Sequence, residues 1–215
     1  GLPSYQNAGS WVTGTILNEW ARLGRGEQAH STLGKAMRER LYPNLTMHFY
    51  HQKYFEIDGN MDATAGIAEM LLQSHRLNAR QEPILDLLPA LPKAWPTGSA
   101  RGLRARGAFT VDLEWRDGSL TEATIRSLKG TPLTVWHNGR TVEMKTEPGQ
   151  TYIFDRNLSA VSSSDPHDTG SSGKTQTSRA AGRPWSSLWL SYEPLPESLQ
   201  SDYAAILRNV YCLGR

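Results

Sequence analysis

The chain has 215 residues, of which 38% are hydrophobic, and its formal net charge is +2. This length suits one or two domains, and a charge so close to neutral argues against a nucleic-acid partner. No apolar run approaches the roughly 20 residues that cross a bilayer, so we expect no membrane partner. The single cysteine, Cys212, excludes an internal disulfide, and with no metal-ligand spacing or phosphate-binding loop in the sequence we expect no cofactor.

The first third of the chain predicts helices. Apolar residues recur at helical spacing within 11–23 and again within 27–41, and the Gly-Arg-Gly link between them favours an αα-hairpin. A third helix is expected over 63–75, with Asn60 or Asp62 as its N-cap. The helical faces are too apolar to stand alone, so we expect further helices as neighbours.

The stretch 54–75 joins an extended approach to an apolar helix through Asp58-Gly59-Asn60. A short turn between buried elements can present a reactive side chain on a rigid scaffold, which makes Asp58 a candidate functional residue. The alternative is an aspartate that only stabilises its own Asp-Gly turn or caps the helix.

From Ile84 onward the pattern predicts strands. Apolar side chains alternate from Phe109 to Trp115, and Asp117-Gly118 and Asn138-Gly139 are hairpin signals. Further strands are expected over 120–128, 133–136, 141–144 and 151–154. This half should form a small antiparallel sandwich or a barrel-like sheet.

Beyond Asn157 the composition shifts to Ser, Thr, Gly and Asp, which predicts disorder over 157–183, with a short helix over 201–211. The expected division is therefore helices in 1–82, a β domain in 83–156 and a low-complexity, disordered tail in 157–215.

Long segments of the chain carry a family resemblance. The runs FEIDGN…ATAGIAEMLLQSH and LLPALPKAWPTGSARGLRARGAFTVDLEW, with LNEWARLGRGEQAH and LYPNL upstream, resemble the family 95 glycoside hydrolases, the inverting α-L-fucosidases. The similarity covers residues 16–154. It implies the last helices of an (α/α)6 barrel followed by a C-terminal β domain, and hence an α+β multidomain fragment. The implied partners are a fucosylated glycan and the missing N-terminal part of the same enzyme. The family implies secretion or a periplasmic location, although this chain contains no signal peptide.

The resemblance also implies a mechanism. Inverting hydrolysis needs two carboxyl groups about 6.5–9.5 Å apart, one as general acid and one as general base. The family's base is the aspartate of the IDGN motif, which corresponds to Asp58. The family's general-acid glutamate and its pair of assisting asparagines have no counterpart here. We therefore expect the chain to derive from an enzyme that hydrolyses terminal α-L-fucosyl linkages. We expect the isolated chain to be inactive.

Three neighbours of Asp58 are further candidates. The resemblance implies that His51 binds the sugar, with His48 as the alternative, and Asn60 is either a helix cap or an orienting partner of the acid. Glu56 stands where the family commonly has glutamine, and a second carboxylate so close would raise the pKa of the base. HQKYFEIDGNMD also departs from the family's HPPFQIDGNFG.

Other residues leave alternatives open. Trp95, Trp115 and Trp136 could form a sugar platform, although Trp115 lies on the inward face of its strand and Trp95 suits packing between domains. The sequons at Asn44 and Asn157 would accept glycans in a eukaryotic secretory route. A carbohydrate-binding or interaction module in which Asp58 is dispensable, and a truncated product without function, are the alternatives to a hydrolase.

Overall fold

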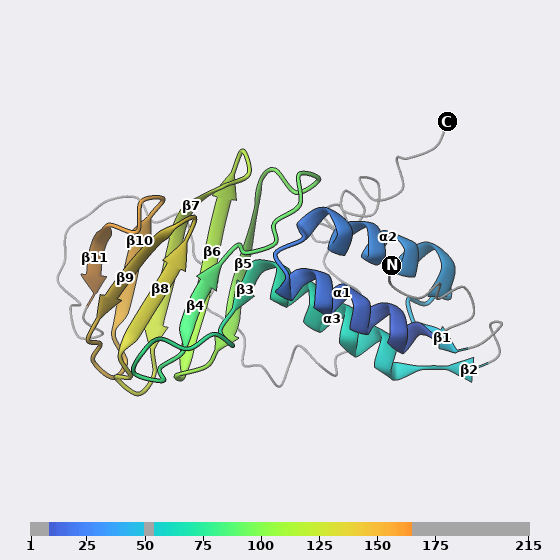
Figure 1. Cartoon of the computed structure of the whole chain (residues 1–215), viewed down its shortest axis with the longest axis horizontal. Helices are drawn as coiled ribbons and strands as arrows, with labels where there is room; N and C mark the ends of the chain where they lie inside the picture. The colour runs from blue at the N-terminus through green and yellow to red at the C-terminus, as the bar shows by residue number, and fades with distance from the viewer. Residues whose placement is uncertain (1–8, 50–53, 165–215) are drawn as a thin grey trace, which may run out of the picture. The chain divides into compact units, whose positions relative to one another are not determined.

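The computed structural model describes residues 9–49 and 54–164 (Figure 1). The predictions for residues 165–215, the helix over 201–211 among them, lie outside the described residues, as does His51. No helix in the described ranges is both long and apolar enough to span a membrane.

Three helices form the first part of the fold: α1 (Ser10–Arg22), α2 (Gly26–Arg40) and α3 (Ile57–Leu71). The first two match the predicted helices to within a residue. They bury Leu17, Ala21, Ala29 and Leu33 in a common core with Met70 of α3. Gly66 lets α1 and α3 approach closely, because a Cβ there would lie 2.5 Å from Cγ of Leu17.

The third helix differs from the prediction at both ends. It begins at Ile57 instead of residue 63, so Asp58 lies in its first turn, and the N-cap position is Glu56 rather than Asn60 or Asp62. It ends at Leu71, because Leu72 and Gln73 pair with Leu87 and Asp86 of a strand. Before the helix, β2 (Tyr54–Phe55) forms the extended approach expected from the sequence, and it pairs with β1 (His48–Phe49).

The second part consists of two sheets. One contains β11-β10-β7-β6-β5 in that order and the other contains β3-β4-β8-β9 (Figure 1). The first sheet is built from β5 (Gly98–Ala105), β6 (Phe109–Arg116), β7 (Ser119–Ser127), β10 (Thr151–Asp155) and β11 (Ala160–Ser164). The second is built from β3 (Leu72–Gln73), β4 (Ile84–Leu87), β8 (Leu133–His137) and β9 (Arg140–Met144).

Side chains from both sheets share one core, which makes this part a β-sandwich. Val111, Leu113 and Ile125 of the first sheet and Leu85 and Val135 of the second are fully buried. Both predicted hairpins form, β6–β7 around Asp117-Gly118 and β8–β9 around Asn138-Gly139. The expectation of a purely antiparallel sheet is wrong, because β4 pairs with β8 in parallel.

The tail prediction is wrong for its first residues. Ala160–Ser164 form β11 and pair with β10, although this segment was expected to be disordered. The serine-rich composition of the segment does not prevent this, because a sheet edge binds a strand through backbone N–H and C=O groups. At the other border, β3 already belongs to the sandwich at residues 72–73, before the expected start of the β domain at 83.

The end of α3 is bonded to the segment that follows β4. The backbone N–H of Leu88 donates to the carbonyl of Leu71 at 2.8 Å, and that of Ala90 donates to Met70 at 3.1 Å. The buried amide of Gln73 donates to the carbonyl of Ala21 at 2.7 Å, which adds the end of α1 to this junction. Helices and sandwich are therefore joined by hydrogen bonds as well as by the chain itself.

Candidate functional site

Asp58 lies in the first turn of α3 and its side chain is exposed. Within the described ranges its carboxylate accepts no hydrogen bond. A negative charge in this position is favoured by the partial positive charge at the helix N-terminus. The side chain is thus held on a fixed helical turn and is accessible for proton transfer.

The turn that carries Asp58 is braced against the start of α1. The carboxylate of Glu56 accepts hydrogen bonds from the hydroxyl of Ser10 and, at 3.1 Å, from the backbone N–H of Trp11. Gly59 permits this close approach, because a Cβ there would lie 2.3 Å from Oγ of Ser10. Glu56 therefore satisfies the free N–H end of α1 and fixes the two helix starts together.

Asn60 has a structural role in the same turn. Its Oδ1 accepts the backbone N–H of Met47 at 2.7 Å and its Nδ2 donates to the carbonyl of Leu45 at 2.9 Å. Both ends of the amide are thus engaged by the loop before β1, so Asn60 positions that loop. Substrate binding by Asn60 stays a prediction.

A third carboxylate, Asp62, follows one helical turn after Asp58. Burial raises its pKa above the usual value, and the charges of Asp58 and Glu56 raise it further, while a hydrogen bond from Thr15 acts in the opposite direction. The neighbouring acids and burial therefore both disfavour the charged form of Asp62.

Of the two candidate histidines the structure describes His48. It is buried on β1, its Nδ1 has no hydrogen-bond partner among the described residues, and its ring lies 5.2 Å from that of Tyr42. His48 is opposite Phe55 in the β1–β2 pair, close in sequence to the Asp58 turn. No group of three or more His, Cys, Asp or Glu within the described ranges could hold a metal ion.

The tryptophans do not form a common platform. Trp115 is buried in the sandwich core, as predicted, and its indole N–H donates to the carbonyl of Trp95 at 2.9 Å. Trp95 packs against both hydrophobic cores, which confirms its predicted place between the two parts. The guanidinium of Arg76 lies 5.2 Å from the ring centroid of Trp136, so one face of this indole is already occupied.

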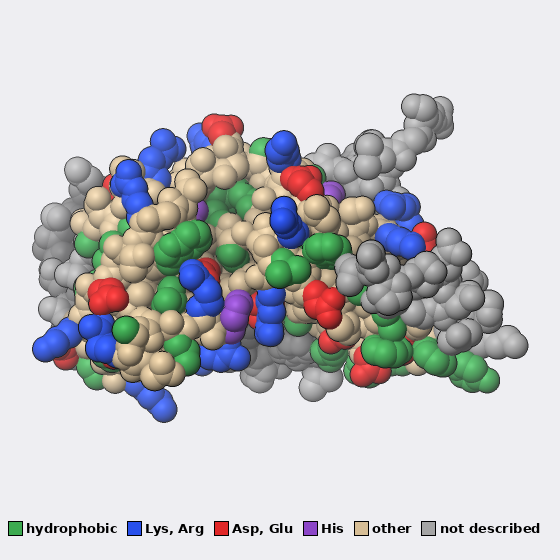
Figure 2. All heavy atoms as spheres, viewed as in Figure 1, with side chains coloured by type: hydrophobic (Ala, Val, Ile, Leu, Met, Phe, Trp, Pro, Cys, Tyr) green, Lys and Arg blue, Asp and Glu red, His purple; other side chains and the backbone are tan. Residues whose placement is uncertain are grey.

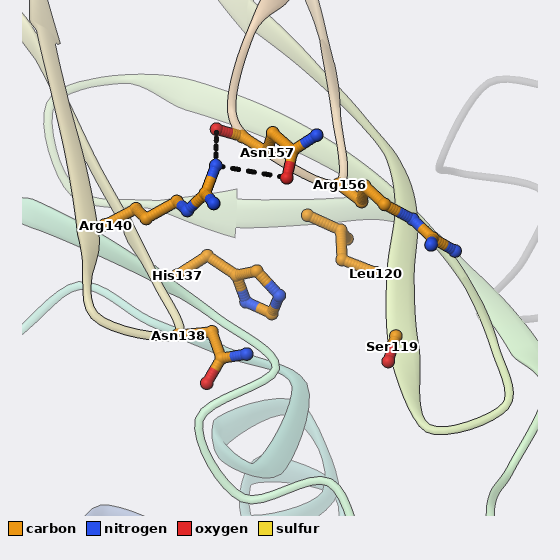
Figure 3. Close-up of a pocket in the computed structure, with 7 residues that line it drawn as sticks. All are labelled: Ser119, Leu120, His137, Asn138, Arg140, Arg156 and Asn157. Carbon is orange, nitrogen blue, oxygen red and sulfur yellow. Dashed lines mark hydrogen bonds between the residues drawn. The ribbon is translucent and has the colours of Figure 1, made fainter.

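The sequence analysis missed a polar hollow on the sandwich. It is lined by His137, Asn138 and Arg140 of the β8–β9 hairpin and by Arg156 and Asn157 after β10 (Figure 3). The two segments lie about twenty residues apart in sequence, and only the Asn138-Gly139 hairpin signal and the sequon at Asn157 marked parts of the hollow beforehand.

Comparison with known proteins gives two adjoining family matches. Residues 4–71 match the glycosyl hydrolase family 95 catalytic domain, and residues 73–163 match the glycoside hydrolase family 95 C-terminal domain. The chain is 34% identical to "Alpha-L-fucosidase 2" of Arabidopsis thaliana in an alignment of 163 residues that covers 70% of this chain and 18% of that protein. It is 31% identical to "Probable alpha-fucosidase A" of Aspergillus niger over 110 residues, 48% of this chain and 14% of that protein.

The chain thus spans less than a fifth of the length of these relatives. The two family matches meet at the end of α3, where the helical part gives way to the sandwich. They agree with the resemblance drawn from the sequence runs, and the chain belongs to glycoside hydrolase family 95.

Proposed function

We propose that this chain is the C-terminal part of an inverting, exo-acting α-L-fucosidase that hydrolyses terminal α-L-fucosyl linkages, with Asp58 as general base. The observation that carries the proposal is the exposed carboxylate of Asp58 on a braced helical turn, inside the motif that corresponds to the family's base. A base must reach an attacking water, and exposure without a competing hydrogen bond in the described part of the chain leaves Asp58 free to do so. The fucosidase names of two relatives support the substrate class.

The isolated chain is inactive in this proposal because it lacks the second acid. Glu56 is engaged by Ser10 and Trp11, and Asp62 lies only one helical turn after Asp58. Neither is positioned as an independent general acid across a substrate, and inversion requires two separated carboxyl groups. The acid comes from the N-terminal part of the same enzyme, which is the proposed protein partner.

The surface of the helices supports this partner. Trp11, Tyr54, Phe55, Ile57 and Met61 are between 47% and 66% exposed although all are large and apolar. Figure 2 shows hydrophobic side chains at the surface where β2 leads into α3, at the lower right. In our proposal the preceding helices of an (α/α)6 barrel cover this face, and His51 binds the sugar beside Asp58.

A chimera provides the test. The segment of the Arabidopsis relative that aligns with this chain is replaced by the chain itself, and hydrolysis of an aryl α-L-fucoside is measured. We expect turnover by the chimera and none by the isolated chain. Asp58→Asn in the chimera should lower kcat by at least about a hundredfold, because general acid–base catalysis contributes about 10² to 10⁴.

The matched control is Asp117→Asn, the same change at an exposed hairpin turn. Asparagine tolerates the left-handed backbone of this position, so the control should keep full activity. Equal activity of the Asp58→Asn and Asp117→Asn chimeras would refute the role of Asp58, and turnover by the isolated chain would refute its inactivity. Fucose binding by the isolated chain that survives Asp58→Ala would favour the alternative, a binding module.

A further inference from the structure

Two adjoining hollows lie beside strands of the sandwich. None of their lining residues belongs to α3, the helix that carries Asp58. Both include Ser119, His137 and Asn138, so they form one continuous depression. Their volumes are about 190 and 250 Å³. Each is smaller than the roughly 300–1,000 Å³ of a pocket for a drug-sized ligand, and each therefore suits a single small ring.

The first hollow is positively charged. Arg140 donates to Oδ1 of Asn157 at 3.0 Å, and Figure 3 shows its guanidinium beside Asn157, whereas Arg156 lines the opposite side and its side chain extends away from Arg140. Within the described ranges no carboxylate lies at ion-pair distance from either guanidinium, as is also true of other exposed arginines such as Arg116 and Arg126. Two uncompensated guanidinium groups at one depression favour an anionic ligand, which arginine binds through paired N–H donors.

The remaining polar groups suit hydroxyls. Nδ1 of His137 lies 2.8 Å from the carbonyl oxygen of Leu87, so Nδ1 carries the proton and donates. In the neutral ring this leaves Nε2 as a hydrogen-bond acceptor, and the ring of His137 lies in the hollow (Figure 3). The amides of Asn138 and Asn157 offer both donors and acceptors, the combination that neighbouring sugar hydroxyls use.

The second hollow has a different lining. It adds Trp136, residues 87–91 at the end of β4 and after it, and Gly24 of the link between α1 and α2, and no Lys, Arg, Asp or Glu lines it. Arg76 occupies one face of Trp136, and the residue still contributes an indole surface to this hollow. An indole beside small apolar groups suits the apolar face of a neutral ring.

We propose that this depression binds a short acidic oligosaccharide, with a uronic acid unit at Arg140 and Arg156 and an adjoining ring beside Trp136. The site is distinct from Asp58 and does not depend on the proposed hydrolysis. It would hold an acidic glycan by the sandwich whether or not the helical part completes an active site.

The test uses the full chain, made in bacteria so that the sequon at Asn157 carries no glycan. Digalacturonate is titrated against the ¹⁵N-labelled chain, with its dimethyl ester as the uncharged counterpart and acetate as the simple anion. We expect digalacturonate to bind at least about tenfold more tightly than either, because charge-assisted hydrogen bonds are the stronger ones. Shifted amide signals should fall in β8, β9 and the segment after β10.

Arg156→Gln should weaken binding about tenfold, and Arg126→Gln is the matched control. Arg126 is also exposed and lies on β7, but it does not line either hollow, so its loss should leave the affinity unchanged. Thermal unfolding of both variants checks that each is folded. Equal binding of the ester, equal binding of acetate, or no binding at all would each overturn the proposal. Loss of binding in Asp58→Asn but not in Arg156→Gln would overturn it too, and would leave the proposed function intact.

Discussion

The sandwich and the helical part of this chain differ in how far each completes its own core. In the sandwich Phe109, Val111, Leu113 and Phe154 are at most 1% exposed, and both faces of the core come from the same short stretch of chain. The described residues include nine exposed large hydrophobic side chains, and seven of them lie in the helical part. They are Trp11, Leu23, Leu45, Tyr54, Phe55, Ile57 and Met61.

This difference separates two kinds of domain. A sandwich buries apolar surface between its own sheets, so it can be stable without neighbours. Three helices bury only one side of each helix, and the other side needs a further layer. The exposed patch therefore supports our proposal that further helices cover this face.

The largest expected effect contrasts two phenylalanines. Phe154 is fully buried in the sandwich, and Phe55 on β2 is 56% exposed. Phe154→Ala should lower the free energy of unfolding by about 3–5 kcal/mol, because it removes a ring and leaves a cavity. Phe55→Ala should change it by less than about 0.5 kcal/mol. Urea unfolding followed by circular dichroism measures both, and similar losses would mean that the two parts are equally complete.

A smaller effect is expected at the ion pair beside the second sheet. Asp86 is buried on β4 and is held by Arg76, whose Nε donates to Oδ2 at 2.7 Å. Asp86→Asn should destabilise the chain by roughly 2 kcal/mol, below the full cost of breaking a buried pair because Arg76 is half-exposed. Arg101→Gln is the control, since its pair with Glu114 is exposed on both sides and should contribute under about 0.5 kcal/mol. An Asp86→Asn chain as stable as the control would show that the sandwich does not depend on this pair.

The smallest effect tests the helical part by pH. Burial and the neighbouring acids raise the pKa of Asp62 in the folded chain above its unfolded value of 3.8. The folded state therefore holds this proton more tightly, and Asp62 lowers stability as pH rises through that interval. Asp62→Asn should raise the unfolding free energy at pH 7 by up to about 0.5 kcal/mol and leave it nearly unchanged at pH 3. A variant that is less stable at pH 7 than the parent would contradict the sign.

Strong local patterns predicted most of the sandwich. The alternation from Phe109 to Trp115 and the turn residues at Asn138-Gly139 each depend only on neighbours in sequence, so β6, β8 and β9 were recognisable. The long strand β5 was missed because its residues do not alternate and its ladder shifts between Ala100 and Leu103. The parallel pairing of β4 with β8 joins segments about fifty residues apart, and no local pattern encodes it.

The candidate site shows the same limit. Asp58-Gly59-Asn60 has the composition of a turn, so the helix was expected to start later. The contact of Gly59 with Ser10 and Met47 is tertiary, and it is compatible with helix from Ile57 onward. Asp58 was found through the resemblance, whereas the polar hollow of the sandwich draws on segments that only folding brings together.

The hydrogen bonds from Leu88 and Ala90 to the last residues of α3 have a consequence for how this family is assembled. The border between the two matched domains falls at residue 72, where separating the domains would remove the donors of two carbonyls and divide the two residues of β3. Exchange of either domain alone at this point would leave unpaired backbone groups at the junction on both halves. Helical catalytic units and their sandwiches should therefore be inherited as one block rather than traded as separate modules.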